Sequence, residues 1–430
     1  MRASLAGGPG VQQASTHPSP TLRKAVSEVT RKRCTLAVSA IAAAVAVAVP
    51  AGAAEAKTYC VHKLTTTCAA GSVDVGDSVQ YALNLAAADT EADTVKIGPG
   101  TYTGPSNGWD AVNDNPLTVS GAGMQKTILD GSGQTVSNPA LRARSATLER
   151  FKLIAPEMGM YQKGITTRLG IVRDVTVADP GKMGQGIVSQ GSSLLRVAVD
   201  VTGEEGIGVL ALPEFVSTSV TASTLTADAA GVAVNKGSAF VTRTRMNGGG
   251  ATTYGGPLTV SNSVIKLGES DNDGVSATCA EGVAMTSLTA DHLTVLGGSA
   301  TDGAAAQCYA SGKAKVTVKN SILATGRSLV RTENAGQTDI LAYSNLLNQG
   351  NTGAVDGGPG HAGKISLGTN LLGSPTFLPG TVLLPSGSFL IDKATPSPTD
   401  VDVNNKPRHV DLDGDGVAEG DIGATERQVK

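Results

Sequence analysis

Val260-Ser261-Asn262-Ser263-Val264-Ile265 returns later in the chain as Val318-Lys319-Asn320-Ser321-Ile322-Leu323. Both segments begin and end on an apolar residue and carry Asn in third place. The same six-residue design recurs about every 24 residues, with the first residues Leu148, Val172, Leu194, Val220, Val241, Val260, Ala290, Val318 and Ala342. The last residues, five positions later, are Leu153, Val177, Val199, Leu225, Met246, Ile265, Val295, Leu323 and Leu347. Such a period is typical of a solenoid, in which each coil packs on its neighbours.

A second series of segments runs between the first, and each member is a glycine followed by an apolar residue. The members are Gly164-Ile165, Gly186-Ile187, Gly206-Ile207, Gly231-Val232, Gly274-Val275 and Gly303-Ala304. Glycine is abundant, at 54 residues, and only 3% of residues are aromatic. This composition suits thin β-coils that stack small and branched side chains. The two interleaved series predict an all-β solenoid of short parallel strands.

The third place of the six-residue segment is polar in all but one coil. The residues there are Arg150, Asp174, Arg196, Ala222, Arg243, Asn262, His292, Asn320 and Ser344. Residues five apart in a straight strand face opposite sides, so both apolar ends can point inward only if the chain bends between them. We therefore predict a bend at the third place, where polar side chains bond the turn backbone and stack along the solenoid.

The N-terminal part of the solenoid resembles a known family. Residues 79–88 predict a short helix with an apolar face, capped by Asp77 or Ser78, that covers the first coil. A strand ending in a Gly-Pro-Gly turn follows at 93–102, and the segment 119–131 comes after it. Together they resemble the opening of pectin-lyase-like proteins. That resemblance implies a right-handed parallel β-helix with three sheets and an N-terminal capping helix.

The C-terminal part resembles bacterial secreted proteins of the choice-of-anchor Q type. The residues that carry the resemblance are Asn370-Leu371-Leu372-Gly373-Ser374-Pro375-Thr376-Phe377, Leu390-Ile391-Asp392, Arg408 and Asp421-Ile422-Gly423-Ala424-Thr425-Glu426. The segment Gly387–Asp392 departs from the family's usual Gly-Ser-Pro-Ala-Ile-Asp. The two resemblances cover residues 80–130 and 370–426. The coils between these ranges agree with a β-helix only in the period of their repeat.

The N-terminus predicts export. The basic cluster Arg31-Lys32-Arg33 precedes an Ala- and Val-rich run at 34–49, and Ala54-Glu55-Ala56 fits a small-x-small cleavage site. The run is shorter than the roughly 20 residues of a spanning helix, which disfavours the alternative of a membrane anchor. We expect a signal peptide with an N-terminal extension at 1–56, a disulfide-closed lead-in at 57–75, a β-helix at 76–350, and a Gly/Pro-rich tail with a closing segment at 351–430.

The charge of the chain excludes one class of partner. The formal charge is −3, and it becomes −7 once the six basic and two acidic residues of 1–56 are removed. The sequence shows no basic stripe interleaved with aromatic residues, so we expect no nucleic-acid partner. We also expect no membrane attachment after cleavage, and secretion to the extracellular space.

Four cysteines remain after cleavage, and an even count in an exported chain predicts disulfides. Cys60 and Cys68 flank a short polar loop and are expected to pair locally. Cys279 and Cys308 each stand five residues after the glycine of their own coil. Stacked parallel strands lie about 4.8 Å apart, which suits a disulfide between these two cysteines. The alternative is a pair of unbonded thiols in the core.

Paired carboxylates are the usual sign of a glycosidase, and the strands after the glycines lack them. Alternation from Val275 predicts these outward residues: Thr166, Arg168, Val188, Gln190, Gly208, Leu210, Ala233, Asn235, Ser276, Thr278, Ala305 and Gln307. None is acidic. Four acidic residues lie just outside this set, and they are either part of a solvated loop or a catalytic or metal-binding cluster. They are Glu269, Asp271, Asp273 and Glu281. Asp291 and His292 are adjacent on a predicted strand, so we expect them to face opposite sides.

The strongest local motif lies near the C-terminus, in residues 411–421. Its carboxylates, Asp411, Asp413, Asp415 and Asp421, alternate with glycines as in the first half of an EF-hand loop. Ile422 stands where an EF-hand has its bidentate Glu, so a complete EF-hand is excluded. The motif predicts either a Ca²⁺ site, the one cofactor that the sequence suggests, or an Asp-Gly turn that fixes the tail.

Two functions stay open from the sequence. The first is a non-catalytic extracellular or cell-surface protein whose long face binds polysaccharide or other surface components. The second is a polysaccharide lyase or glycoside hydrolase. Few carboxylates on the predicted face and few aromatic residues favour the first. Trp109, the single Trp, stands in a Gly/Asn-rich loop and is expected either to contact a ligand or to pack on the first coils.

Overall fold

The computed structural model describes residues 55–63, 67–88, 90–134, 138–156, 162–178, 184–201, 203, 205–268, 273–299, 301–308, 311–333, 336–347, 352–357, 364–397, 401–411 and 418–428. The predicted signal peptide at 1–56 therefore lies outside the described residues, apart from its last two. No helix in the described part of the chain is long and apolar enough to span a membrane.

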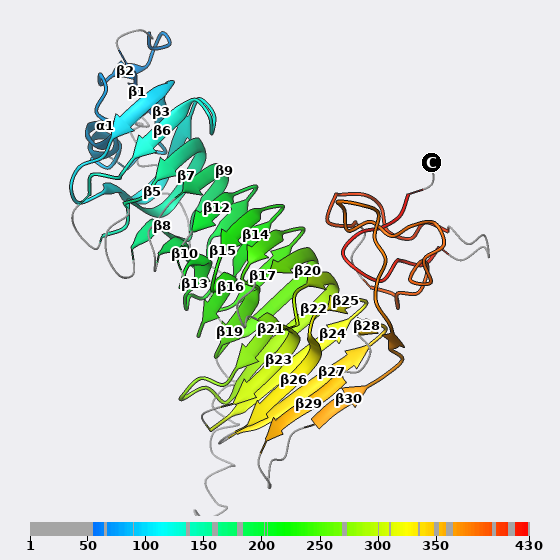
Figure 1. Cartoon of the computed structure of the whole chain (residues 1–430). Helices are drawn as coiled ribbons and strands as arrows, with labels where there is room; N and C mark the ends of the chain where they lie inside the picture. The colour runs from blue at the N-terminus through cyan, green and yellow to red at the C-terminus, as the bar shows by residue number, and fades with distance from the viewer. Residues whose placement is uncertain are drawn as a thin grey trace, which may run out of the picture. The chain divides into compact units, whose positions relative to one another are not determined.

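The described strands stack as a parallel β-helix with three ladders (Figure 1). Every pairing between named strands is parallel, and each strand pairs with its counterparts in the coils before and after it. Long strands such as β7 (Leu141–Ile154) contribute to all three ladders because they run across two bends. The predicted fold class, a parallel β-helix, is confirmed.

The first ladder holds the first residues of the six-residue segments in one register, from Leu148 to Ala342. Its strands are β1 (Thr58–Val61), β3 (Thr94–Ile97), β5 (Trp109–Gly121), β7, β9 (Ile171–Ala178), β11 (Ser193–Leu195), β14 (Thr218–Thr221), β17 (Ala239–Thr242), β20 (Pro257–Leu267), β22 (Met285–Leu296), β24 (Lys313–Lys319), β27 (Gln337–Tyr343) and β30 (Lys364–Leu367), with β2 (Val73–Asp74) beside β1.

The second ladder holds the last residues of the same segments, from Leu153 to Leu347. Its strands are β4 (Gly100–Thr103), β6 (Thr127–Asp130), β12 (Ala198–Val201), β15 (Thr224–Ala227), β18 (Arg245–Gly248), β25 (Ile322–Ala324), β28 (Leu346–Leu347) and β31 (Leu371–Leu372), together with parts of β7, β9, β20 and β22.

The third ladder contains the glycine series. Its strands are β8 (Lys163–Arg168), β10 (Gln185–Gln190), β13 (Ile207–Ala211), β16 (Ala230–Asn235), β19 (Ala251–Tyr254), β21 (Asp273–Thr278), β23 (Asp302–Cys308), β26 (Arg327–Glu333) and β29 (Thr352–Gly357), preceded by parts of β5 and β7. The coil after Val241 is complete, because β19 forms directly after its three consecutive glycines and pairs with both neighbours.

The bend predicted at the third place is present in every one of these coils. The backbone φ there is positive at Arg150 (60°), Asp174 (54°), Arg196 (49°), Ala222 (51°), Arg243 (52°), Asn262 (46°), His292 (52°), Asn320 (51°) and Ser344 (54°). A left-handed residue between two short strands turns the chain so that both apolar ends face the core. All nine first residues and all nine last residues are buried.

The side chains that bond the turn backbone stand in fourth place, not in third as the sequence predicted. Ser263 Oγ accepts from the backbone N–H of Thr244, one coil earlier, at 3.2 Å. Ser321 Oγ accepts from Leu293 N at 3.0 Å, and Asn345 Oδ1 accepts from Ser321 N at 2.9 Å. The reason is that the left-handed turn directs the fourth side chain into the stack. Several third-place side chains instead bond the C-terminal segment.

The helix α1 (Val79–Ala86) packs its apolar face against the first coils. Ser78 is the N-cap, and its side chain accepts a hydrogen bond from Tyr81 N at 3.3 Å. Val79, Ala82, Leu83 and Ala86 are buried and belong to the same hydrophobic core as the strands. Trp109 is also buried in this core, only 2% exposed, so it packs on the first coils.

Both disulfides predicted from the cysteine spacing are present. Cys60 and Cys68 pair within the lead-in, with their Cα atoms 5.8 Å apart. Cys279 and Cys308 join two adjacent coils, with their Cα atoms 4.7 Å apart. The register that pairs Thr278 with Gln307 places these cysteines side by side.

The C-terminal segment, residues 373–428, packs against the bends of the β-helix. Arg408 Nε donates to the side chain of Asn262 at 3.0 Å. Ala424 N donates to Thr294 Oγ1 at 3.0 Å, and Gly423 N donates to the carbonyl of Asn320 at 2.8 Å. Apolar side chains from both parts form two further buried clusters, which include Ile322, Leu346, Leu390 and Ile422 in one and Val264, Val403 and Ala424 in the other.

Candidate functional site

The glycines of the third ladder determine which residues face outward. A Cβ on Gly186 would lie 2.1 Å from Val199 Cγ1, and one on Gly274 would lie 2.4 Å from Val295 Cγ1. Only glycine lets the backbone approach the core this closely. The next residue also points inward, since Ile187 and Val275 are fully buried. The residue before the glycine is therefore free to lie on the outer face.

Asp273 and Asp302 occupy this position in two successive coils, and Arg327, which precedes Ser328, lies in register with them in the next coil. Asp273 pairs in register with Asp302, and Asp302 pairs with Arg327. Neighbouring parallel strands lie about 4.8 Å apart, so the three side chains form one row. We call Asp273, Ser276, Asp302, Gln307 and Arg327 the sheet-face cluster.

A bidentate ion pair holds one side of the sheet-face cluster. Arg327 Nε lies 2.6 Å from Asp302 Oδ1, and Arg327 Nη2 lies 3.0 Å from Asp302 Oδ2. The Asp302 side chain is 9% exposed, whereas that of Arg327 is 47% exposed. The planar guanidinium thus fixes the orientation of a nearly buried carboxylate.

Asp273 lies in a different environment from its neighbour. Gln307 Nε2 donates to Asp273 Oδ2 at 3.3 Å, and Ser276 also bonds this carboxylate. Burial, and then the negative charge of Asp302, raise the pKa of Asp273 to about 7, against the opposing effects of Ser276 and Arg327. One carboxyl of the pair therefore holds a proton near neutral pH, while the other is ion-paired.

The surroundings of the cluster present hydroxyl groups and one exposed ring. Ser276 Oγ donates to Thr252 Oγ1 at 2.8 Å, on the neighbouring strand β19. Tyr254, on the same strand, is 46% exposed and pairs in register with Thr278. An exposed aromatic ring beside hydroxyl and carboxyl groups is the kind of surface that packs against a sugar.

Sequence reasoning found only part of this cluster. Asp273 was among the loop acids, but Glu269 and Asp271 lie outside the described residues, and Glu281 lies in an exposed turn beyond the other end of β21. Asp302 and Arg327 were missed because alternation was counted from the residue after the glycine. The repeated pair Asp273-Gly274 and Asp302-Gly303 was the available signal.

The predicted outward face needs two corrections. Val188, Ala233 and Ala305 are buried and offer no surface. Gly208, expected to face outward, aligns with the inward-pointing Gly186, because the register pairs Ile207 with Gln185 and Val209 with Ile187. A Cβ on Gly208 would lie 3.3 Å from the core atom Leu225 Cβ. The glycine of this coil is therefore Gly208 and not Gly206, a slip of two residues that leaves the outward direction of Leu210 unchanged.

Asp291 and His292 contact each other, contrary to the sequence expectation. The positive φ of His292 rotates its side chain, and its Nδ1 lies 2.9 Å from Asp291 Oδ1. Burial lowers the pKa of His292 to about 4, so the ring is neutral. Burial alone would raise the pKa of Asp291, but His292, Ser397 and Lys319 together lower it. This pair is covered by the C-terminal segment.

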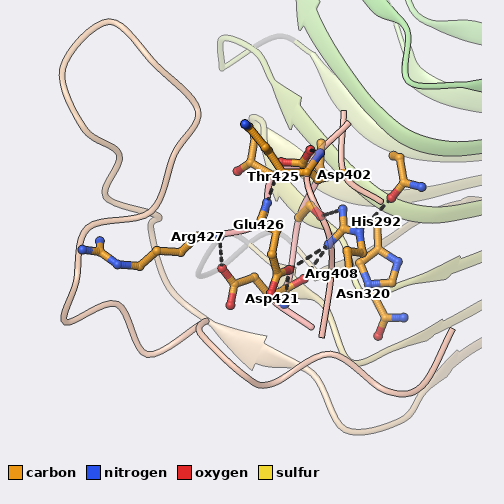
Figure 2. A network of polar contacts seen from close by, with 12 residues as sticks. His292, Asn320, Asp402, Arg408, Asp421, Thr425, Glu426 and Arg427 are labelled. Atoms are coloured by element: carbon orange, nitrogen blue, oxygen red, sulfur yellow. Dashed lines mark hydrogen bonds and ion pairs between the residues drawn. The ribbon is translucent and has the colours of Figure 1, made fainter. Parts of the chain in front are cut away.

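Four of the residues that carried the C-terminal resemblance lie in one buried network: Arg408, Asp421, Thr425 and Glu426 (Figure 2). Leu371 and Leu372, which also carried it, are exposed. Arg408 Nη1 lies 3.4 Å from Glu426 Oε2, and neither side chain is exposed. Asp421 accepts hydrogen bonds from the backbone N–H of Asp392 at 3.1 Å and of Arg427 at 2.8 Å. Burial, and then the charge of Asp421, raise the pKa of Glu426 to about 8. Burial also raises the pKa of Asp421.

The Ca²⁺ loop predicted at 411–421 is described only at its ends. Asp413 and Asp415 lie outside the described residues, while Asp411 and Asp421 lie within them. Asp421 is fully buried in the network of Figure 2. The loop as a whole therefore stays a prediction.

No protein-family model matches this chain, and no curated protein matches it. Among solved structures, the pectate lyase Pel9A is 13% identical over 88% of this chain and 98% of its own, with a TM-score of 0.48. The PL6 family alginate lyase AlyGC is 12% identical over 73% of this chain and 51% of its own, with a TM-score of 0.43. The GH87 α-1,3-glucanase from Streptomyces thermodiastaticus is 12% identical over 68% of this chain and 65% of its own, with a TM-score of 0.40. The function has to be argued from this chain's own residues.

Proposed function

We propose that this protein is an extracellular enzyme that hydrolyses polysaccharide at the sheet-face cluster. The observation that carries the proposal is the unequal pair Asp273 and Asp302 on adjacent strands. Two neighbouring carboxyl groups whose environments separate their protonation states are suited to acid–base catalysis. Glycoside hydrolysis requires such a pair.

The environments suggest a role for each residue. Asp273, protonated near neutral pH, acts as the general acid that protonates the glycosidic oxygen. Asp302, whose carboxylate Arg327 holds in place, acts as the nucleophile, because carboxyl groups on adjacent strands, about 5 Å apart, match the retaining geometry. Tyr254 supplies a ring for a neighbouring sugar unit. The two disulfides suit an oxidising extracellular compartment, which supports secretion.

A panel of neutral and acidic polysaccharides tests the proposal, with release of reducing ends as the measurement. We expect Asp273→Asn and Asp302→Asn to lower the rate by about 10²–10⁴-fold. Asp200→Asn is the matched control, since Asp200 is an exposed acid on the second ladder. Equal rates in the control and Asp273→Asn, or products that absorb in the ultraviolet as lyase products do, contradict this mechanism.

The second function, a non-catalytic surface protein that binds polysaccharide, is supported by a separate observation. The positions in register with Ser276 in the earlier coils are Thr166, Val188, Leu210, Ala233 and Thr252; none is a carboxylate, and Val188 and Ala233 are buried. The C-terminal resemblance to choice-of-anchor Q proteins also agrees with a cell-surface role. Retention on an immobilised polysaccharide, without reducing ends released by the wild type, would favour this function.

A further inference from the structure

Three buried carboxylates meet inside the C-terminal segment. Asp392, Asp421 and Glu426 each offer one oxygen, and these oxygens lie within 4.8 Å of one another. The three residues are 2%, 0% and 1% exposed. They come from two stretches of chain that the hydrogen bond from Asp392 N to Asp421 Oδ1 holds together.

The guanidinium of Arg408 makes only a weak contact with this cluster. Arg408 Nη1 lies 3.4 Å from Glu426 Oε2, a long contact for an ion pair. Most of its other donors go to neutral groups: the side chain of Asn262 and the carbonyls of Asp421 and Gly423. Buried like charges in excess are unfavourable unless a cation or protons neutralise them.

One oxygen of the cluster has no hydrogen bond. Glu426 Oε1 is buried and accepts none from any residue that the structure describes. Its partner oxygen Oε2 accepts from Asp421 N at 2.9 Å, which fixes the carboxylate in its orientation. A fixed, buried and unsatisfied carboxylate oxygen is a ligand position for a metal ion.

We infer that Asp392, Asp421 and Glu426 bind a Ca²⁺ ion that holds the C-terminal segment closed. The set offers only carboxylate oxygens, which are the ligands that hard cations prefer, and no sulfur or imidazole within it. The inferred site shares Asp421 with the loop predicted at 411–421 but draws its other ligands from elsewhere. Asp402 does not belong to it, because it is not among the carboxylates whose oxygens lie within 4.8 Å of one another.

Equilibrium dialysis with ⁴⁵Ca²⁺ at about pH 9, above the raised pKa of Glu426, tests the site on the purified protein. We expect the wild type to bind Ca²⁺, and Glu426→Gln and Asp392→Asn to bind it about tenfold or more weakly. Asp413→Asn is the matched control and is expected to bind as the wild type does. Absence of Ca²⁺ binding by the wild type overturns the inference, as does loss of binding in Asp413→Asn alone.

Thermal unfolding separates a metal ligand from a merely structural residue. In chelator at about pH 9, above the raised pKa of Glu426, Glu426→Gln removes a buried negative charge, so its Tm should equal or exceed that of the wild type. With Ca²⁺ present, the order should reverse because only the wild type gains stability by binding. An equal fall of Tm in both conditions overturns the inference. Asp302→Asn tests independence from the sheet-face cluster and should leave Ca²⁺ binding unchanged.

Discussion

Asn320 and Thr395 exchange three hydrogen bonds across 75 residues of sequence. The Asn320 Oδ1 atom accepts from both the backbone N–H and the hydroxyl of Thr395, each at 2.8 Å, and its Nδ2 donates to the Thr395 carbonyl at 3.1 Å. Asn320 is also the left-handed bend residue of its coil. One side chain therefore joins the C-terminal segment to the β-helix.

Replacing Asn320 by Gly should loosen this attachment without straining the bend. Glycine keeps the positive φ, but the Thr395 N–H and carbonyl lose their partners. We expect a loss of about 1–3 kcal/mol in the free energy of unfolding, and faster proteolysis near residue 395. Asn235→Gly, at an exposed strand position, is the control, and similar proteolysis in both variants would contradict the argument.

Ala222 offers a test of the bend itself. It is the one third-place residue without a polar side chain, and its φ is 51°. A left-handed conformation costs a non-glycine residue roughly 1–2 kcal/mol, so Ala222→Gly should stabilise the protein by up to about that amount. Ala198→Gly, at a regular strand position, should destabilise it by about 0.5–1 kcal/mol. Denaturant unfolding of both variants measures the sign, and a loss in both refutes the bend argument.

The stability of the protein should depend on pH through Asp273. Its pKa is about 7 in the folded state, against 3.8 for the free side chain. The folded state therefore binds this proton more tightly, so the stability it contributes is complete below about pH 4 and is lost as the pH rises to about 7. The loss is at most about 4 kcal/mol at the top of this window. Asp273→Asn should reduce the slope between these pH values and leave the part that Glu426, with its pKa raised to about 8, contributes. An unchanged slope would show that Asp273 does not titrate there.

The two disulfides should differ in their contribution to stability. The Cys279–Cys308 bond closes a span of 29 residues, and the Cys60–Cys68 bond closes one of 8. Chain-entropy arguments give the longer span about 1 kcal/mol more stabilisation. Replacing each pair by alanines, followed by urea unfolding, measures the difference. A larger loss for the Cys60 and Cys68 pair would mean that local packing outweighs chain entropy.

The sequence predicted the repeating part of the structure well because that part is local. Apolar first and last residues, a bend at the third place, and cysteines at equal offsets all follow from a period that can be counted along the chain. The slip at Gly206 shows the limit: a neighbouring Gly-Ile pair matched the pattern, and only core packing at Gly208 identifies the correct glycine.

The sites were harder to predict because they depend on contacts between distant segments. Asp302 and Arg327 meet only through the register of successive coils. Asp392 and Asp421 meet through a fold of the C-terminal segment that shows no periodicity. Asp291 and His292 were expected to diverge as on a regular strand, but the left-handed bend brings them together.

The bends that receive the C-terminal segment also limit how this protein can change in length. Asn405 bonds Arg243, Arg408 bonds Asn262, and Thr395 bonds Asn320, so the segment follows bends of successive coils. Insertion or deletion of a coil between Arg243 and Asn320 would move these partners out of reach. Among the described residues, the hydrogen bonds of the C-terminal segment reach no coil before Val241, so natural variation in repeat number should be concentrated in the N-terminal half of the β-helix.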